Sequence, residues 1–153
     1  MVLNLNSFCK RSYPAILLIL LAGELVYANT FRVPFVLDDH LWITHNDFIK
    51  SLGTFCANYS RYSTRFIALL TLALNYHYGG LSVIGYHVVN LIIHLLTALF
   101  VYTLLRLTFH TPYFRIQRPI ANSKLKTPLC FIPLFAALLF VVHPVQTEAV
   151  TYV

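Results

Sequence analysis

The longest uninterrupted apolar run in this chain extends from Leu81 to Leu105 and holds no formally charged side chain. Twenty-five residues of this kind exceed the roughly 20 that a helix needs to cross a bilayer. Of the 153 residues, 58% are hydrophobic and 10% are charged, and the mean hydropathy is +0.70. An average soluble domain carries about 25% charged residues. The composition excludes a soluble enzyme and predicts an all-α integral membrane protein, folded as a helical bundle.

Two more segments are expected to span the membrane. Residues 13–31 are apolar apart from Glu24, and residues 128–144 enclose a shorter apolar run that flanking residues lengthen. The run Phe66–Tyr76 is too short to cross and stops before two glycines, which predicts a helix lying in the interface or re-entering it. We therefore expect about three transmembrane helices, at 13–31, 81–105 and 128–144, and interfacial helices in the loop 32–80.

The first span has a second interpretation, as a cleaved signal peptide. Lys10-Arg11 would be its basic region and Val26-Tyr27-Ala28 its cleavage site. Glu24 within the apolar run, and the further membrane-bound chain, favour an uncleaved anchor.

The basic residues predict the orientation. Residues 1–12 hold Lys10 and Arg11 without an acid, and loop 106–127 holds five basic residues, also without an acid. Short loops rich in Lys and Arg remain in the cytoplasm. The N-terminus and loop 106–127 are therefore predicted to be cytoplasmic. Loop 32–80 and the segment 145–153 are predicted to lie on the outer side.

Two neighbouring carboxylates, Asp38 and Asp39, follow the first span on that outer side. A carboxylate at a low-dielectric boundary is suited to accept a proton from a hydroxyl, or to hold a divalent cation with its neighbour. The alternative is structural, with Asp39 as the N-cap of a short helix over Leu41–Leu52. Glu148 and His143 are predicted on the same side, so Asp38, Asp39 and Glu148 could share one site, including a metal site.

Two arginines of the outer loop are candidates for binding phosphate. Arg61 and Arg65 lie four residues apart, on one side of a helix that Ser63 or Thr64 would start. The guanidinium fork suits the phosphate of a lipid. The alternative is ordinary anchoring to lipid headgroups.

Three polar residues lie inside the second span. His87, Asn90 and His94 recur at a spacing that places them on one helical face. One interpretation is a pair of metal or haem ligands. The other is a hydrogen-bonded polar seam that packs against another helix. Either way, further helices, from a longer chain or a partner subunit, are implied.

Together these motifs resemble a known enzyme family. Phe35–Asp39 resembles the first-loop signature of GT-C-type membrane glycosyltransferases, and Gly85-Tyr86-His87 with Asn90 and His94 is similar to the region that follows. His143–Val153 resembles the HPVxTEAV block of the transmembrane and tetratricopeptide-repeat O-mannosyltransferases and their bacterial relatives.

The resemblance implies transfer of a sugar, here mannose, from a polyprenyl-phosphate carrier to a protein hydroxyl on the outer or lumenal face. It implies Asp38 as general base, Asp39 as its neighbour or a cation ligand, His143 and Glu148 as second-loop members of the site, and Arg65 as a phosphate contact. The implied partners are membrane lipids, the lipid-linked sugar and a protein acceptor, with no nucleic acid. The implied location is the bacterial inner membrane or the endoplasmic reticulum, as a multi-pass protein.

Some features depart from the family pattern. Its members have many spans followed by helical repeats, and they usually have Arg-Pro where Arg65-Phe66 stands here. We therefore expect the chain to be the N-terminal part of such an enzyme, too short to be active alone. The alternative function is a small non-catalytic membrane anchor, or a haem-binding bundle that uses His87 and His94.

Overall fold

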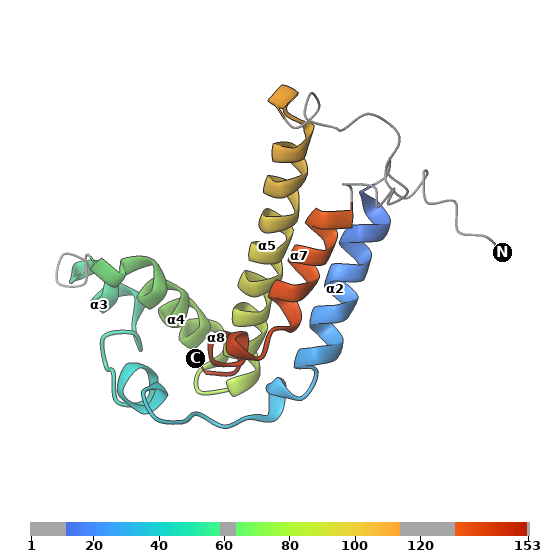
Figure 1. Ribbon diagram of the computed structural model, residues 1–153. Helices are drawn as coiled ribbons and strands as arrows, with labels where there is room; N and C mark the ends of the chain where they lie inside the picture. The colour runs from blue at the N-terminus through green and yellow to red at the C-terminus, as the bar shows by residue number, and fades with distance from the viewer. Residues whose placement is uncertain (1–11, 59–63, 114–130, 153) are drawn as a thin grey trace, which may run out of the picture. The chain divides into compact units, whose positions relative to one another are not determined.

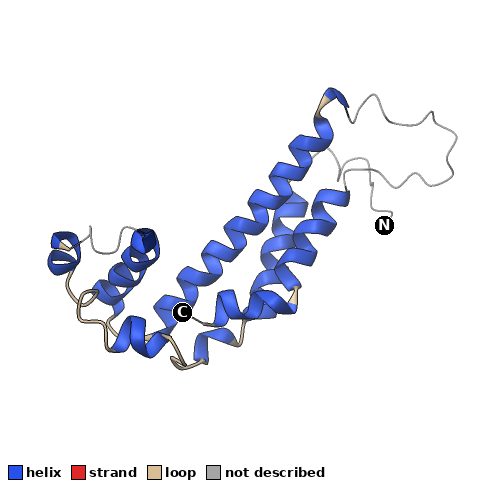
Figure 2. Cartoon of the chain, turned by 60° about the vertical axis from the view of Figure 1, so that its left-hand side comes forward, coloured by secondary structure: helices blue, strands red, loops and turns tan. Residues whose placement is uncertain are grey.

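The computed structural model describes residues 12–58, 64–113 and 131–152 (Figure 1). Every regular element within these ranges is helical, as the cartoon in Figure 2 shows. The predicted all-α class is therefore confirmed. In chain order the elements are α2 (Tyr13–Tyr27), η1 (Thr30–Arg32), η2 (His40–Thr44), α3 (Leu52–Ala57), α4 (Phe66–Gly79), α5 (Val83–His110), α7 (Phe131–Val142), η4 (Pro144–Gln146) and α8 (Thr147–Thr151).

The chain divides into two compact units. The bundle unit comprises the described residues of 12–26 and 93–146, and the loop unit comprises those of 27–92 and 147–152. The long helix α5 contributes its first part to the loop unit and its remainder to the bundle unit.

The bundle unit is built from α2, the C-terminal part of α5, and α7, which lie side by side (Figure 1). Its core contains several small residues, and these allow close approach of helix backbones. The buried set is Ala15, Ile19, Ala98, Tyr102, Leu134, Ala137 and Val141. Gly23 continues the α2 face, and a Cβ added there would contact the Leu95 side chain and lie 3.3 Å from Val141 Cγ1. The lack of a side chain at Gly23 thus leaves room for its neighbours.

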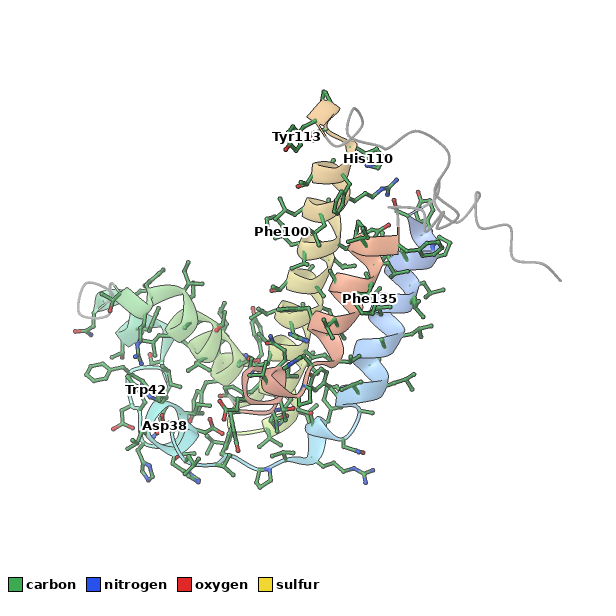
Figure 3. All side chains as sticks on the ribbon, in the orientation of Figure 1. Asp38, Trp42, Phe100, His110, Tyr113 and Phe135 are labelled. Atoms are coloured by element: carbon green, nitrogen blue, oxygen red, sulfur yellow. The ribbon has the colours of Figure 1, made fainter. Side chains whose placement is uncertain are left out.

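The outward faces of the same helices are apolar. Leu25 is 79% exposed, and Phe100 and Phe135, labelled in Figure 3, are 66% and 68% exposed. Large exposed apolar surfaces indicate contact with another apolar phase. Two segments, Tyr13–Arg32 and Val83–His110, have the length and apolarity to cross a membrane. The helices Phe131–Val142 and Pro144–Thr151 are separated by a bend. If this bent pair is taken as one membrane span, the described residues hold three spans. The protein is therefore a membrane protein.

The observed helices differ from the predicted segments at their ends. Helix α5 continues beyond Leu105 to His110. In its last turn His110 Nδ1–H donates to Arg106 O over 2.6 Å, and a histidine near a helix C-terminus interacts favourably with its carbonyls. The third helix breaks at His143-Pro144, since proline lacks an N–H and restricts the preceding residue. Most of the predicted loop 106–127, and the start of the third segment, lie outside the described residues.

The loop unit has a hydrophobic core of its own. It buries Ile43, Ile49, Phe55, Leu69, Ala73 and Tyr86. The Phe55 and Phe66 rings stack with centroids 5.6 Å apart, which joins α3 to α4. The described residues of loop 32–80 thus form a folded element around α4. The helix predicted over Phe66–Tyr76 is present and ends at Gly79, and its position at a membrane interface stays a prediction.

Candidate functional site

The two aspartates occupy a tight turn with unequal surroundings. The Asp39 N–H donates to Val36 O over 3.0 Å, and Asp39 Oδ2 accepts from the Val36 N–H over 2.9 Å. Asp39 is buried, at 2% exposure, whereas Asp38 is exposed. Because its neighbour closes the turn, Asp38 is presented at the surface of the loop unit.

The backbone of this turn is strained at Leu37. Its φ of 48° lies in the left-handed region, which is uncommon for residues other than glycine, asparagine and aspartate. Such a conformation costs of order 1–3 kcal/mol and persists where the surroundings fix it. The contacts that hold the turn therefore determine where Asp38 lies.

The helix that Asp39 was predicted to cap is different in the structure. A π-helix covers only His40–Thr44, and the next helix starts at Leu52, so no helix spans Leu41–Leu52. Asp39 stands at the N-cap position, but its side chain makes no capping hydrogen bond. Its carboxylate instead bonds backward to Val36, which removes it from the forward position that a cap requires.

Trp42 and Arg65 come together beside this turn. The Arg65 guanidinium lies over the Trp42 ring, with Cζ 5.2 Å from the ring centroid. This distance is within the range of a cation–π contact. Arg65 is the N-cap residue of α4, and Thr64 and Arg65 form a 3-10 turn that leads directly into this helix. Arg61 lies outside the described residues. Figure 3 shows Asp38 and Trp42 in the same part of the loop unit.

A surface hollow of about 340 Å³ adjoins Trp42. Its lining is Leu41, Trp42, His45, Asn46, Asp47 and Phe48. Asp47 forms an ion pair with Lys50, with 2.7 Å between the carboxylate oxygen and Nζ. This contact lowers the pKa of Asp47 and raises the pKa of Lys50. The hollow was not predicted, because it depends on the π-helix of η2.

The second acidic segment is the short helix α8, which carries an exposed Glu148. Glu148 belongs to the loop unit together with Asp38, Asp39 and Arg65, whereas His143 belongs to the bundle unit. Over the described part of the chain, no group of three His, Cys, Asp or Glu side chains could hold a metal ion. The metal site at Asp38, Asp39 and Glu148 stays a prediction.

The polar residues of α5 bond to backbone carbonyls of distant segments. His87 Nε2–H donates to Val33 O over 2.9 Å, and Asn90 Nδ2 donates to Tyr152 O over 2.8 Å. These two bonds lie in the loop unit. In the bundle unit, His94 Nε2–H donates to Val141 O over 3.3 Å, and its ring stacks on Phe140 with centroids 5.1 Å apart.

This arrangement bears on the ligand interpretation of the histidines. Both imidazoles use Nε2 for a carbonyl, so a metal or haem iron at Nε2 would have to displace that bond. A histidine that binds a metal usually offers one ring nitrogen while the other donates to a protein acceptor. The remaining His87 Nδ1 is buried and has no hydrogen-bond partner within the described residues.

Two contacts that sequence reasoning missed connect these segments. The Phe35 and Tyr86 rings meet edge to face with centroids 5.3 Å apart. Thr30 Oγ1 and Thr151 Oγ1 lie 3.4 Å apart. The aromatic residues at positions 35 and 86 could have suggested a pair, but threonines 121 positions apart carry no detectable sequence signal.

Comparison with known proteins finds three relatives. The chain is 38% identical over 96 residues to protein O-mannosyl-transferase Tmtc3 of Drosophila melanogaster, covering 60% of this chain and 10% of the relative. It is 32% identical over 145 residues to protein O-mannosyl-transferase tmtc2 of Xenopus laevis (84% and 15%). It is 30% identical over 138 residues to protein O-mannosyl-transferase Tmtc1 of Drosophila melanogaster (82% and 14%). The matches thus span a small part of each relative. No protein-family model and no solved structure matches the chain.

Proposed function

We propose that this chain belongs to the Tmtc family and is a membrane-embedded segment of a protein O-mannosyl-transferase. It would move a mannose from a polyprenyl-phosphate carrier to a hydroxyl of an acceptor protein. The observation that carries the proposal is the acidic turn, in which a buried Asp39 presents an exposed Asp38. The similarity of most of the chain to the Xenopus relative, named for this activity, supports it.

In this proposal Asp38 is the general base. Its carboxylate accepts the proton of the acceptor hydroxyl while that oxygen forms a bond to the anomeric carbon of the sugar. The bond from the anomeric carbon to the phosphate oxygen breaks, and the polyprenyl phosphate leaves with the electron pair. A base in this role contributes typically about 10²–10⁴-fold to the rate.

The neighbouring groups have supporting roles. Asp39 holds the turn through Val36, so its carboxyl group is fixed beside the base. Arg65, exposed beside Trp42, is a contact for the phosphate of the carrier, together with Arg61. Glu148, exposed on α8 in the same unit, is a second-loop member of the site.

The proposed chemistry requires one orientation in a multi-pass protein. The N-terminus faces the cytoplasm, and loop 32–80 faces the opposite compartment, where the lipid-linked donor presents its sugar. Residues 1–12 contain the basic pair Lys10-Arg11 and no acidic residue. This excess of basic residues favours a cytoplasmic N-terminus.

A chimera tests the proposed function. The matched segment of the Xenopus relative is replaced by this chain, and transfer of labelled mannose to protein is measured in membranes supplied with the polyprenyl-phosphate donor. We expect the chimera to transfer mannose and Asp38→Asn to reduce the rate about 10²–10⁴-fold.

The matched control is Asp47→Asn, which removes an exposed carboxylate of the same loop outside the turn. It should leave the rate unchanged. A chimera that works equally well with Asn at position 38 would contradict the assignment of the base.

A further inference from the structure

Helix α5 holds the segment that leads into the acidic turn. His87 and Tyr86, consecutive and both 1% exposed, contact it at two points. His87 Nε2–H bonds Val33 O, and the Tyr86 ring meets the Phe35 ring. Tyr86 is itself fixed, because its hydroxyl donates to Gly80 O over 2.9 Å. The three residues before Val36 are thus attached to one turn of α5.

The same face of α5 holds the second acidic segment. Asn90, one helical turn after His87, donates to Tyr152 O. The Tyr152 N–H in turn donates to Glu148 O over 3.1 Å, so this bond fixes the end of α8. The Thr30–Thr151 contact connects α8 to the chain that precedes the acidic turn.

The identity of residue 87 is not explained by packing alone. The buried Nδ1 of His87 has no partner among the described residues, and burying an unsatisfied polar atom lowers stability. An apolar side chain of similar size would avoid that cost. The gain that offsets it in the structure is the part-buried hydrogen bond from His87 Nε2 to the carbonyl of half-buried Val33.

We propose that His87 and Asn90 are positioning residues, which hold the Asp38 turn and the Glu148 helix at fixed places on one face of α5. The carboxylates are placed through this helix, because no described contact joins Asp38 to Glu148 directly. The role of this positioning in catalysis rests on the proposed function. The positioning itself does not depend on the proposed function.

Spin labels test this without any assay of transfer. The full chain, with its three native cysteines replaced by serine, receives a nitroxide at Leu37→Cys in the turn or at Ala149→Cys in α8. Each label is recorded by electron paramagnetic resonance in lipid nanodiscs. A label at Leu17→Cys on the exposed face of α2 reports on the rest of the fold.

We expect His87→Leu to abolish the immobilised spectral component at position 37 and to leave position 149 unchanged. Asn90→Leu should do the reverse. His87→Gln should restore the immobilised component at position 37, because the glutamine amide keeps an N–H near the place of Nε2. A loss of fold would instead mobilise all three labels together.

The proposal is overturned if His87→Leu leaves the label at position 37 immobilised, or if Gln and Leu at position 87 behave alike. Nitrogen NMR of labelled histidine in the unsubstituted chain gives a second measurement. The His87 signal, assigned by its absence in His87→Gln, should show Nε2 protonated and Nδ1 bare. A proton on Nδ1 would also overturn the proposal.

The experiments distinguish a failure of the positioning proposal from a failure of the proposed function. If the labels respond as expected while the chimera transfers no mannose, the positioning stands and the proposed function falls. If the chimera depends on Asp38 while the labels do not respond, the positioning falls alone.

Discussion

Asp38 and Asp39 are adjacent in sequence, yet one is exposed and the other nearly fully buried. Their presence beside a membrane segment was sufficient to predict an acidic site. Their division of roles could not be predicted, because it depends on which backbone N–H the Asp39 carboxylate reaches. The same holds for His87 and Asn90: helical spacing predicted a shared face, but the carbonyls they bind lie 54 and 62 positions away.

Two adjacent glycines provide a prediction at the residue scale. Gly80 has φ of 57° and ψ of −127°, a region that side chains rarely adopt, whereas Gly79 is the last helical residue of α4. Gly80→Ala should lower the free energy of unfolding by about 1–3 kcal/mol, and Gly79→Ala should change it by less than about 0.5 kcal/mol. Denaturant titration followed by circular dichroism measures both. Equal effects would contradict the backbone assignment at Gly80.

The Asp47–Lys50 ion pair provides a pH prediction. The Lys50 ammonium lowers the pKa of Asp47, so the contact is present above the ordinary pKa of aspartate and is lost as pH falls through the lowered value. Since Asp47 raises the pKa of Lys50, the contact persists below the ordinary pKa of lysine and is lost as pH rises through the raised value. Carboxyl-carbon NMR should show the Asp47 pKa rising in Lys50→Gln. An unchanged titration would contradict the pair.

At the scale of elements, the apolar runs and the residues that end them predicted the positions of helices. The helix at Phe66–Gly79 was expected from an apolar run closed by two glycines, and both features act locally. The π-helix at His40–Thr44 was not expected, because it forms around Ile43, which is buried against distant parts of the loop unit. The hollow beside Trp42 was missed for the same reason.

Helix packing in the bundle unit is tested at Gly23. A Cβ there meets the end of the Leu95 side chain and approaches Val141. Because the Leu95 terminus can move, Gly23→Ala should be tolerated. Gly23→Val should reduce stability by about 1–3 kcal/mol through overpacking. Thermal unfolding in detergent measures this, with Leu25→Val on the exposed face of α2 as the control. A neutral Gly23→Val would show that α2 does not pack as described.

At the scale of the whole molecule, composition alone predicted a membrane protein, since hydropathy depends on which residues are present and not on their contacts. The division into two units was not predicted, because it falls within continuous helices such as α5. Sequence patterns predict where helices begin and end. The boundaries of compact units depend on tertiary contacts between residues that are distant in the sequence.

We propose that the acidic turn lies in the compartment opposite the N-terminus, where a base can reach a lipid-linked sugar. The most direct measurement is labelling by a membrane-impermeant maleimide, in sealed vesicles of known orientation, of a cysteine at Leu37 or at Tyr113. Both side chains are exposed, at 78% and 62%. We predict that position 37 is labelled only from the non-cytoplasmic side and position 113 only from the cytoplasmic side. Labelling of position 37 from the cytoplasm would contradict this orientation.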